Sequence, residues 1–210
     1  MPQRVLIALA LVALYFIWGS TFLGMRFAIE SFPPFMMAAI RFVTAGALLY
    51  GWLRWRGIAA PSPQEWLGAT VVGTLLLAAA SWALGSLWGK HLAMPKGAMA
   101  SAAQMLAGGA VLVVISLLAQ EPWPAHVSAK SLYAIAYLIV FGSLIAYSAY
   151  LFLLQHVRPA LATSYAFVNP LVAMLLGAAL AGEHIDRAEY MALAIIIVGV
   201  LLVLPFERRT

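Results

Sequence analysis

The chain has 210 residues, of which 65% are hydrophobic and only 9% are charged, and its mean hydropathy is +0.98. Soluble domains carry about 25% charged residues, so this composition excludes a soluble globular protein and indicates a lipid environment. A net charge of +5 would suggest nucleic acid in a soluble protein. Here the basic residues stand singly at the ends of apolar runs, where membrane topology explains them. We therefore expect the lipid bilayer, and no nucleic acid, as a partner.

Seven apolar runs follow one another along the chain, each long enough to be considered as a membrane span. About 20 apolar residues cross the hydrocarbon core as a helix, and isolated strands cannot cross lipid. The predicted spans are about Val5–Gly24, Phe35–Leu53, Trp66–Gly89, Ala98–Ala119, Leu132–Leu154, Ala160–Ala181 and Tyr190–Leu204. Because the connections are short, they predict an all-α, polytopic membrane helical bundle of about seven transmembrane helices.

The basic residues give conflicting orientations for these spans. If all seven cross, five Lys or Arg residues lie on the N-terminal side and six on the other, although short loops normally obey the positive-inside rule. The conflict disappears if an even number of crossings separates Arg56 from Lys90. The chain therefore looks as though it lacks an odd number of spans near residues 66 to 80; a dual-topology protein is the alternative. If both termini lie inside, the stretch Trp66–Lys90 is the first suspect for a segment that does not cross.

An internal repeat is consistent with missing material. The run YFIWGS (15–20) aligns with SWALGS (81–86), and RFVTAG (41–46) aligns with QMLAGG (104–109) at nearly the same spacing. Weak internal repeats in transporters indicate two halves related by pseudo-symmetry, with the substrate site between them. Chance similarity between apolar spans is the alternative.

Polar residues within the spans provide candidates for a binding site but not for catalysis. All seven acidic residues and all four histidines lie at span ends or in loops, so we expect no enzyme, no metal site and no cofactor. Arg41 is the one ionisable residue well inside a span. Either its role is structural, with the side chain extended to the membrane interface or bonded to a helix carbonyl, or it contacts an anionic substrate. The mild polar groups either bond their own backbone or, with the tryptophans, line a cavity for an amphipathic solute. The predicted substrate-binding residues are Trp18, Ser20, Thr21, Arg41, Trp82, Ser86, Gln104, Ser143, Tyr147, Tyr165 and Asn169.

Pro170 predicts a break in the sixth span, because a proline removes one helical hydrogen bond and leaves the Ala166 carbonyl without its donor. Asn169 beside it is a candidate partner for substrate or for that backbone.

Several of these motifs resemble one known family. The sequence WGSTFLGMRFAIESFPPFMMAAIRF (18–42) resembles the opening of an EamA-domain protein of the drug/metabolite transporter superfamily, and SWALGSLWGKHL (81–92) resembles the start of its second repeat. Residues 141–185 resemble the last helices of that repeat, with Arg158-Pro159, Asn169-Pro170 and Gly182-Glu183 as the strongest part.

The resemblance implies ten spans in two inverted five-helix repeats, with both termini in the cytoplasm. On this pattern, residues 1–65 form a partial first repeat with two spans and the start of a third. Residues 66–210 form a second repeat of five spans, the first of them a composite. Restoring the missing spans places eight basic residues inside and three outside.

The resemblance also implies a function. We expect a multi-pass protein of a bacterial inner membrane that exports small metabolites, amino acids or drugs by alternating access between the repeats. The alternative is a non-transporting membrane protein, truncated or engineered, or one that functions only as a homodimer.

Overall fold

The chain is described by a computed structural model for residues 2–75, 92–182, 184–187, 190–191, 193–195 and 198. Within these residues, five helices are long and apolar enough to cross a membrane: Gln3–Ala28, Pro34–Trp55, Ala98–Leu118, Ala129–His156 and Leu161–Ala181. They coincide with the predicted first, second, fourth, fifth and sixth spans. The third and seventh predicted spans lie largely outside the described residues. The prediction of an all-α, polytopic membrane bundle is confirmed.

Two of the spans contain a π-helical segment in their middle. The first span consists of α1 (Gln3–Val12), the π-helix η1 (Ala13–Trp18) and α2 (Gly19–Ala28). The span Ala129–His156 likewise consists of α7 (Ala129–Tyr137), the π-helix η2 (Leu138–Ile145) and α8 (Ala146–His156). A π segment widens the helix locally and is often found at functional sites.

The remaining helices begin at residues that favour a helix start. Pro34 opens α3 (Pro34–Trp55) and Pro159 opens α9 (Pro159–Thr163). In front of α4 (Pro63–Leu75), Ser62 and Glu65 form the predicted reciprocal cap, with Ser62 N donating to Glu65 Oε2 at 2.7 Å. The fourth span is α6 (Ala98–Leu118).

The last long helix, α10 (Tyr165–Ala181), continues through Pro170, so the helix does not end at this proline. The helical pattern is instead interrupted at Ser164, between α9 and α10. Gly182, with φ +66°, ends α10 in the left-handed conformation that glycine adopts readily.

Helices α3 and α6 form the closest helix pair, and they run antiparallel. A Cβ atom at Gly46 would lie 2.8 Å from Leu106 N, and one at Gly109 would lie 2.8 Å from Val43 N. Small residues allow this approach, as is common between membrane helices. Helix α4 packs on the other side of α6, where Gly73 lies against Gly108.

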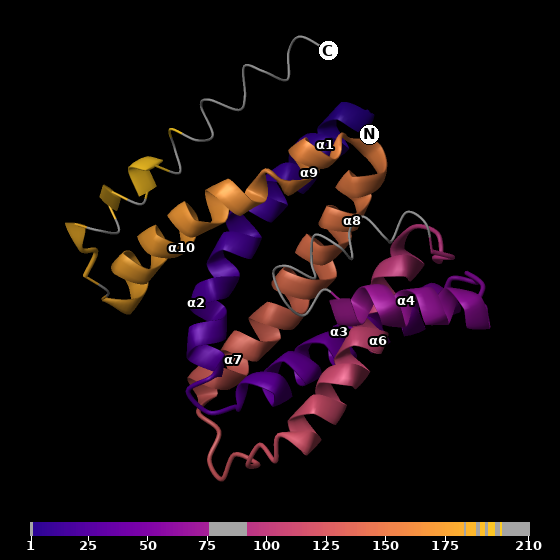
Figure 1. The fold of residues 1–210 in the computed structure, drawn as a ribbon, viewed down its shortest axis with the longest axis horizontal. Coiled ribbons are helices and arrows are strands. Elements are labelled where there is room, and N and C mark those ends of the chain that lie inside the picture. The colour runs from indigo at the N-terminus through magenta and orange to yellow at the C-terminus, as the bar shows by residue number, and fades with distance from the viewer. Residues whose placement is uncertain are drawn as a thin grey trace.

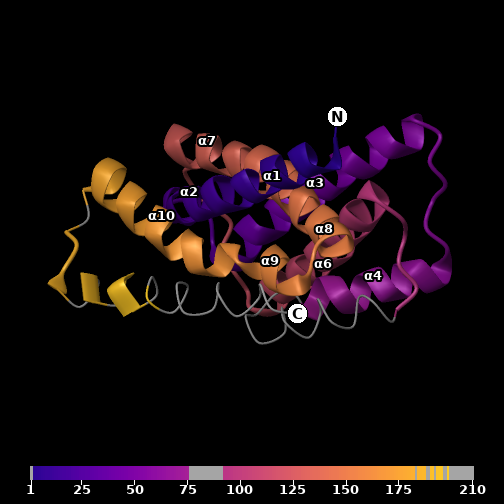
Figure 2. The same ribbon diagram turned by 90° about the horizontal axis from the view of Figure 1, so that it is seen from above.

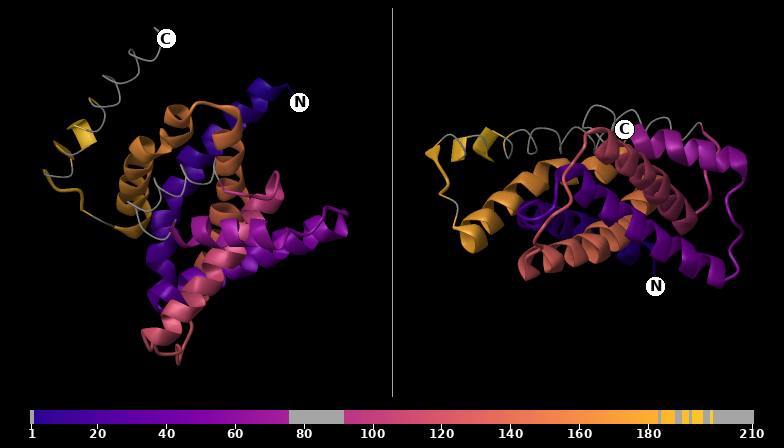
Figure 3. Two further views of the ribbon diagram at one scale, coloured as in Figure 1. Left: turned by 45° about the vertical axis from the view of Figure 1, so that its right-hand side comes forward. Right: turned by 90° about the horizontal axis from the view of Figure 1, so that it is seen from below.

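The spans are arranged so that α10 and α4 lie on opposite sides of the molecule (Figure 1). Helix α10 packs along α2 and η1, and α4 packs along α6, with α3 and the α7–α8 span between them. The views in Figures 2 and 3 show the same separation of α10 from α4.

The alternating directions of the helices define two ends of the bundle. The N-terminal end contains the starts of α1, α4, α6 and α9 and the ends of α3 and α8. The distal end contains the ends of α2, α6 and α10 and the starts of α3 and α7. Contacts fix this assignment: Leu53 packs against Met99 at the N-terminal end, and Ser131 bonds Phe27 O at the distal end.

Trp66 and Ala93, one before and one after residues 76–91, both lie at the N-terminal end. The ring of Trp66 is 6.0 Å from that of Tyr50, near the end of α3, and a Cβ at Gly68 would lie 2.3 Å from Ala93 O. The predicted span Trp66–Gly89 lies mostly outside the described residues. Its flanking residues Trp66 and Ala93 nevertheless lie on the same side of the bundle.

Candidate functional site

Arg41 is buried in the middle of the bundle. Only 8% of its surface is exposed, and it lies on the second turn of α3, about 10 Å along the helix from Pro34. Its Nε donates to Ser143 Oγ at 2.7 Å, and its guanidinium carbon lies 4.9 Å from the centroid of the Phe42 ring. The side chain therefore does not snorkel to the helix end. An Arg at a helix centre costs about 2.5–3.5 kcal/mol on insertion scales, so a buried arginine indicates a role that offsets this cost.

Gly142 brings three of the predicted residues together. Its carbonyl accepts a 2.9 Å hydrogen bond from Trp18 Nε1. A Cβ at this position would lie 2.8 Å from both Arg41 Nη2 and Thr21 Cγ2. Only a glycine leaves room for the indole, the guanidinium and the threonine methyl at this point of η2.

A second polar pair lies about one helical turn along the same span. Tyr147 donates its hydroxyl to Gln104 Oε1 of α6, and both side chains are buried. Ser143 and Tyr147 are four residues apart, so the Arg41–Ser143 and Gln104–Tyr147 pairs form one polar seam along the α7–α8 span. The first pair joins this span to α3 and the second joins it to α6.

An aromatic cluster adjoins this seam through Trp18. The Trp18 ring lies 4.8 Å from Tyr165 in an edge-to-face arrangement and 5.3 Å from Tyr150. Tyr150 and Tyr165 are themselves edge to face at 5.6 Å. Such pairs stabilise packing beyond their buried area by about 0.5–1.5 kcal/mol. They hold Trp18 between α8 and α10.

Asn169 connects α10 to the first π segment. In the amide orientation that satisfies both neighbours, its nitrogen donates to Leu14 O and Tyr165 O, each at 3.2 Å. Leu14 lies in η1 and Gly142 lies in η2, and a carbonyl of each π segment thus accepts a side-chain donor from another helix. The two carbonyls that Asn169 bonds differ from the Ala166 carbonyl that the sequence predicts as its backbone partner.

Most of the predicted site residues meet in one region. A connected set is formed by Trp18, Thr21, Arg41, Gln104, Ser143, Tyr147, Tyr165 and Asn169. Thr21 also bonds its own backbone at Trp18 O. Ser20 points elsewhere, to Ile17 O and the Tyr137 hydroxyl. Trp82 and Ser86 lie outside the described residues.

Two residues of this region were not predicted from the sequence. Gly142 was missed because one small residue in an apolar span carries no chemical signal. Tyr150, fully buried in the aromatic cluster, was missed because its spacing is that of an ordinary core residue.

A cavity of about 420 Å³ lies between α3 and α6 toward the distal end, and none of the predicted site residues lines it. Glu121 lies at its edge and accepts hydrogen bonds from Phe35 N at 2.9 Å, Met36 N at 2.7 Å and Ser116 Oγ at 2.7 Å. Partial desolvation raises the pKa of Glu121. The hydrogen bonds from Ser116 and from the two α3 amides outweigh it, so the pKa lies below the ordinary 4.5. Glu121 therefore caps the start of α3 from the end of α6.

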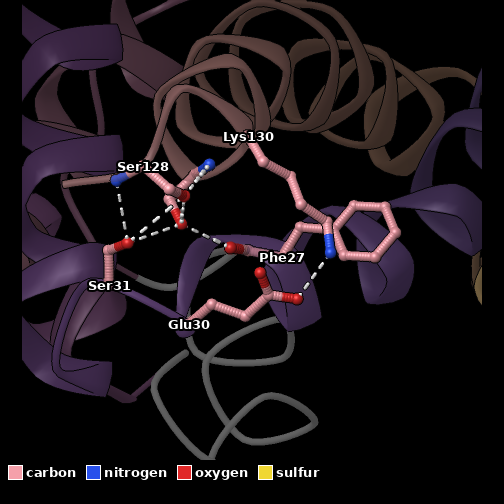
Figure 4. A network of polar contacts seen from close by, with 6 residues as sticks. Phe27, Glu30, Ser31, Ser128 and Lys130 are labelled. Carbon is pink, nitrogen blue, oxygen red and sulfur yellow. Dashed lines mark hydrogen bonds and ion pairs between the residues drawn. The ribbon is translucent and has the colours of Figure 1, made fainter.

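A polar cluster at the distal end, the distal loop network, consists of Glu30, Ser31, Ser128, Lys130 and Ser131 (Figure 4). Lys130 Nζ lies 2.7 Å from Glu30 Oε1 and 3.9 Å from the centroid of the Phe27 ring. Ser128 N donates to Ser31 Oγ, and buried Ser131 donates to Phe27 O at 2.8 Å. The network ties the end of α2 to the start of α7.

Comparisons with known proteins place these features in a family. The model of the EamA-like transporter family matches residues 5–76 and again residues 69–204. The uncharacterized inner membrane transporter YedA of Escherichia coli K12 is 35% identical over 272 residues, covering 92% of this chain and 89% of YedA. Because the alignment takes in 92% of the 210 residues, or about 193, about 79 of its 272 positions fall opposite gaps in this chain.

Other relatives match shorter parts. Protein PecM of Dickeya dadantii is 30% identical over 109 residues, which cover 50% of this chain and 36% of PecM. An uncharacterized transporter of Archaeoglobus fulgidus is 37% identical over 73 residues, covering 34% of this chain and 25% of its own length. No solved structure shows a significant match. The predicted inner-membrane, multi-pass location is confirmed, and the chain belongs to the EamA-like transporter family.

Proposed function

We propose that this protein is a secondary transporter that exports small metabolites, amino acids or drugs by alternating access, with the polar seam as its substrate path. One observation carries the proposal: Arg41, in the part of the chain assigned to the first repeat, bonds Ser143, in the second, inside the membrane-spanning region. Transporter sites lie near the midplane at the interface of two repeats. The family is one of transporters, which favours a non-enzymatic role.

The contacts of α3 with α6 are compatible with an inverted relation between two repeats. The alignment of residues 41–46 with 104–109 makes Val43 equivalent to Leu106 and Gly46 equivalent to Gly109. The observed contacts are Val43 with Gly109 and Gly46 with Leu106, which exchange under this equivalence. A two-fold axis between the helices requires such paired contacts. Arg41 and Gln104 are equivalent in the same alignment, and both bond to the α7–α8 span.

The proposed repeat boundaries are residues 1–65 and 66–210, with the end of the first repeat missing. The two family matches overlap at residues 69–76, close to this boundary. The gaps of about 79 positions in the YedA alignment have room for about three helices of about 20 residues each with their connections. Three is an odd number, as the charge distribution requires.

We place the N-terminal end of the bundle in the cytoplasm. Among the described basic residues other than Arg41, Arg26, Lys130 and Arg187 lie at the distal end. Those at the N-terminal end are Arg4, Arg54, Arg56, Lys96 and Arg158. This five-to-three excess is the sense of the positive-inside rule.

Transport is tested with purified protein in proteoliposomes loaded with a radiolabelled panel of amino acids, small metabolites and drug-like cations. Efflux above that of empty vesicles is expected for at least one class. Equal rates with and without protein across the whole panel would overturn the proposal for this chain.

The gaps in the YedA alignment favour a second candidate, a chain that transports nothing alone or that works only as a homodimer in which each copy completes the other. Crosslinking in native membranes, followed by flux with purified monomer and purified dimer, separates these cases. Flux carried by monomers would eliminate the dimer; flux confined to dimers would replace the single-chain proposal.

A further inference from the structure

We propose that the Arg41 guanidinium is the binding point for the carboxylate of the transported solute, so that the substrates of this protein are carboxylate-bearing molecules. This inference rests on the proposed transport function and names its substrate class. It is drawn from the partners of Arg41, from its burial and from the charges around it.

The first step concerns the hydrogen bonds of Arg41. A guanidinium carries five N–H donors, and only Nε–H is used, by Ser143 Oγ. Among the described residues, the two terminal nitrogens, with four N–H groups, have the Phe42 ring as a neighbour but no acceptor. Among the described residues, the one fully buried side-chain N or O atom without a partner is Ser148 Oγ, so the terminal nitrogens of Arg41 keep some exposed surface and are open to an acceptor that another molecule can supply.

The second step concerns charge. No described acidic residue forms an ion pair with Arg41, in contrast to Lys130, which pairs with Glu30. A buried cation without a counter-ion favours binding of an anion. Two parallel N–H groups of a guanidinium match the two oxygens of a carboxylate or of a phosphate.

The third step chooses between these two groups. A phosphate monoester carries about two negative charges at neutral pH, whereas a carboxylate carries one. Arg41 supplies one positive charge, and the other described basic residues lie at the ends of the spans. Charge balance inside the bundle therefore favours the carboxylate.

The fourth step concerns the surroundings of the terminal nitrogens. Nη2 lies beside Gly142, where a Cβ would be only 2.8 Å away, and Thr21 and Trp18 meet at the same glycine. A carboxylate at Nη2 would thus have an indole and the Thr21 methyl group next to it, since the Thr21 hydroxyl donates to Trp18 O. This environment suits an amphipathic acid, such as an amino acid with an apolar side chain.

The experiment uses chemically matched pairs that differ in the carboxylate: L-phenylalanine with L-phenylalaninamide, and phenylacetate with phenylacetamide. Binding to the purified full chain is followed by the shift in its thermal melting temperature over a concentration series. Transport is followed by counterflow of radiolabelled L-phenylalanine in proteoliposomes, with each unlabelled compound as a competitor. The variants are Arg41→Gln, Arg41→Lys and Ser143→Ala, and Arg56→Gln is the matched control at the exposed end of α3.

In the wild type, each acid should bind at least about 30-fold more tightly than its amide, since removing one partner of a buried, hydrogen-bonded charge pair has an effect of this size or larger. Arg41→Gln should abolish the difference. Arg41→Lys should keep the preference but reduce it about 10-fold, because an ammonium does not form the two-pronged contact. Ser143→Ala should reduce the preference without abolishing it, because it removes the hydroxyl that orients the guanidinium, and Arg56→Gln should leave the preference unchanged.

A preference for the acids that survives in Arg41→Gln would overturn the inference. The inference would also fail if the wild type bound acid and amide equally tightly, or if it bound neither compound. If Arg41→Gln does not fold, the test rests on Arg41→Lys. A preference for the acids as large in Arg41→Lys as in the wild type would contradict a contact made by two guanidinium nitrogens. These outcomes are distinct from failure of the proposed function. If the wild type binds the acids but moves no solute, only the transport function is contradicted. If the wild type transports neutral solutes and Arg41→Gln has no effect on this transport, only the carboxylate-binding role of Arg41 is contradicted.

Discussion

At the distal end of the bundle, hydrogen bonds and an ion pair join segments far apart in the sequence, whereas at the N-terminal end the described contacts between helices are mainly apolar. Distally, the end of α2 is tied to α7 through Ser131 and Lys130, and the start of α3 is tied to the end of α6 through Glu121. At the N-terminal end, Leu53, Met99 and Ala102 pack together. The loop hydrogen bonds there are local, as between Arg54 and Ile58 O.

The hydrogen bonds of the distal end select which segments pair with one another, whereas the apolar contacts of the N-terminal end are less selective. Hydrogen bonds need a particular donor and acceptor in line, while apolar contacts depend on shape and buried area. In the proposed alternating-access cycle, the distal contacts are therefore those that must separate when the distal end opens. Four changes test this comparison.

The largest expected effect is on cysteine labelling, in which each engineered cysteine should be accessible from only one side of the membrane. The chain contains no cysteine, so single cysteines can be placed at exposed Ala60 and Ala93 of the N-terminal end and at exposed Ala125 of the distal end. A membrane-impermeant maleimide added to spheroplasts should label Ala125→Cys alone. The other two should react only after lysis. Labelling of Ala60→Cys and Ala93→Cys on opposite sides would mean that the stretch between them crosses once and that the two ends are misassigned.

A smaller but still severe effect is expected in the middle of the α3–α6 pair, on which both ends depend. Gly46→Leu places its Cβ 2.8 Å from Leu106 N and 3.1 Å from Ala102 O, and backbone atoms cannot move aside as a flexible side chain can. Overpacking of this kind should destabilise the fold by about 3 kcal/mol or more. Melting temperature and the monodisperse fraction in detergent measure it.

Gly51→Leu is the matched control, on the same helix and with no atom within 4 Å of its Cβ position. It should leave the melting temperature almost unchanged. Equal losses in both variants would show that the glycines act through helix propensity and not through close packing.

The sequence was sufficient to predict the five spans that the structure describes, because the length and the apolar character of each run are local properties. It also predicted the Ser62–Glu65 cap, in which donor and acceptor are three residues apart. The burial of Arg41 followed from its position in an apolar run, and its partner Ser143 was in the predicted set. Their pairing was not predicted, because it depends on how α3 is placed against the α7–α8 span.

The π segments could not be predicted from the sequence, because they too depend on how distant helices pack against one another. The runs ALYFIW and LIVFGSLI have no residue that distinguishes a π-helix from an α-helix. Their carbonyls at Leu14 and Gly142 are bonded by Asn169 and Trp18, which lie more than 120 residues away in the chain. The break expected at Pro170 illustrates the opposite limit, since the proline removes a hydrogen bond but the surrounding helix continues.

At the distal end, Glu121→Ala should lower the free energy of unfolding by about 1–2 kcal/mol, because it removes the cap of α3. The lowered pKa of Glu121 gives the effect a pH dependence. A carboxylate whose pKa is depressed by folding stabilises the protein above its ordinary pKa of 4.5, and this contribution is lost as the pH falls through the lowered value. The melting temperatures of wild type and variant should therefore differ at pH 7 and converge in acid.

Gln155→Ala, at an exposed position of the N-terminal end, serves as the control and should match the wild type throughout. A difference between wild type and Glu121→Ala that persists below the lowered pKa would assign the effect to packing and not to the charged cap.

The smallest effect should come from the ion pair of the distal loop network. The side chains of Lys130 and Glu30 are 50% and 44% exposed, and exposed pairs contribute about 0.2–1 kcal/mol that added salt screens. A double-mutant cycle with Glu30→Gln and Lys130→Met, measured by thermal melting at low and high salt, isolates this coupling. Ser131→Ala, in the same network but fully buried, should remove about 1 kcal/mol without salt dependence, because it leaves Phe27 O without its donor. A coupling for the ion pair that exceeds the Ser131 effect and resists salt would mean that charge, and not the buried hydroxyl, holds the distal end closed.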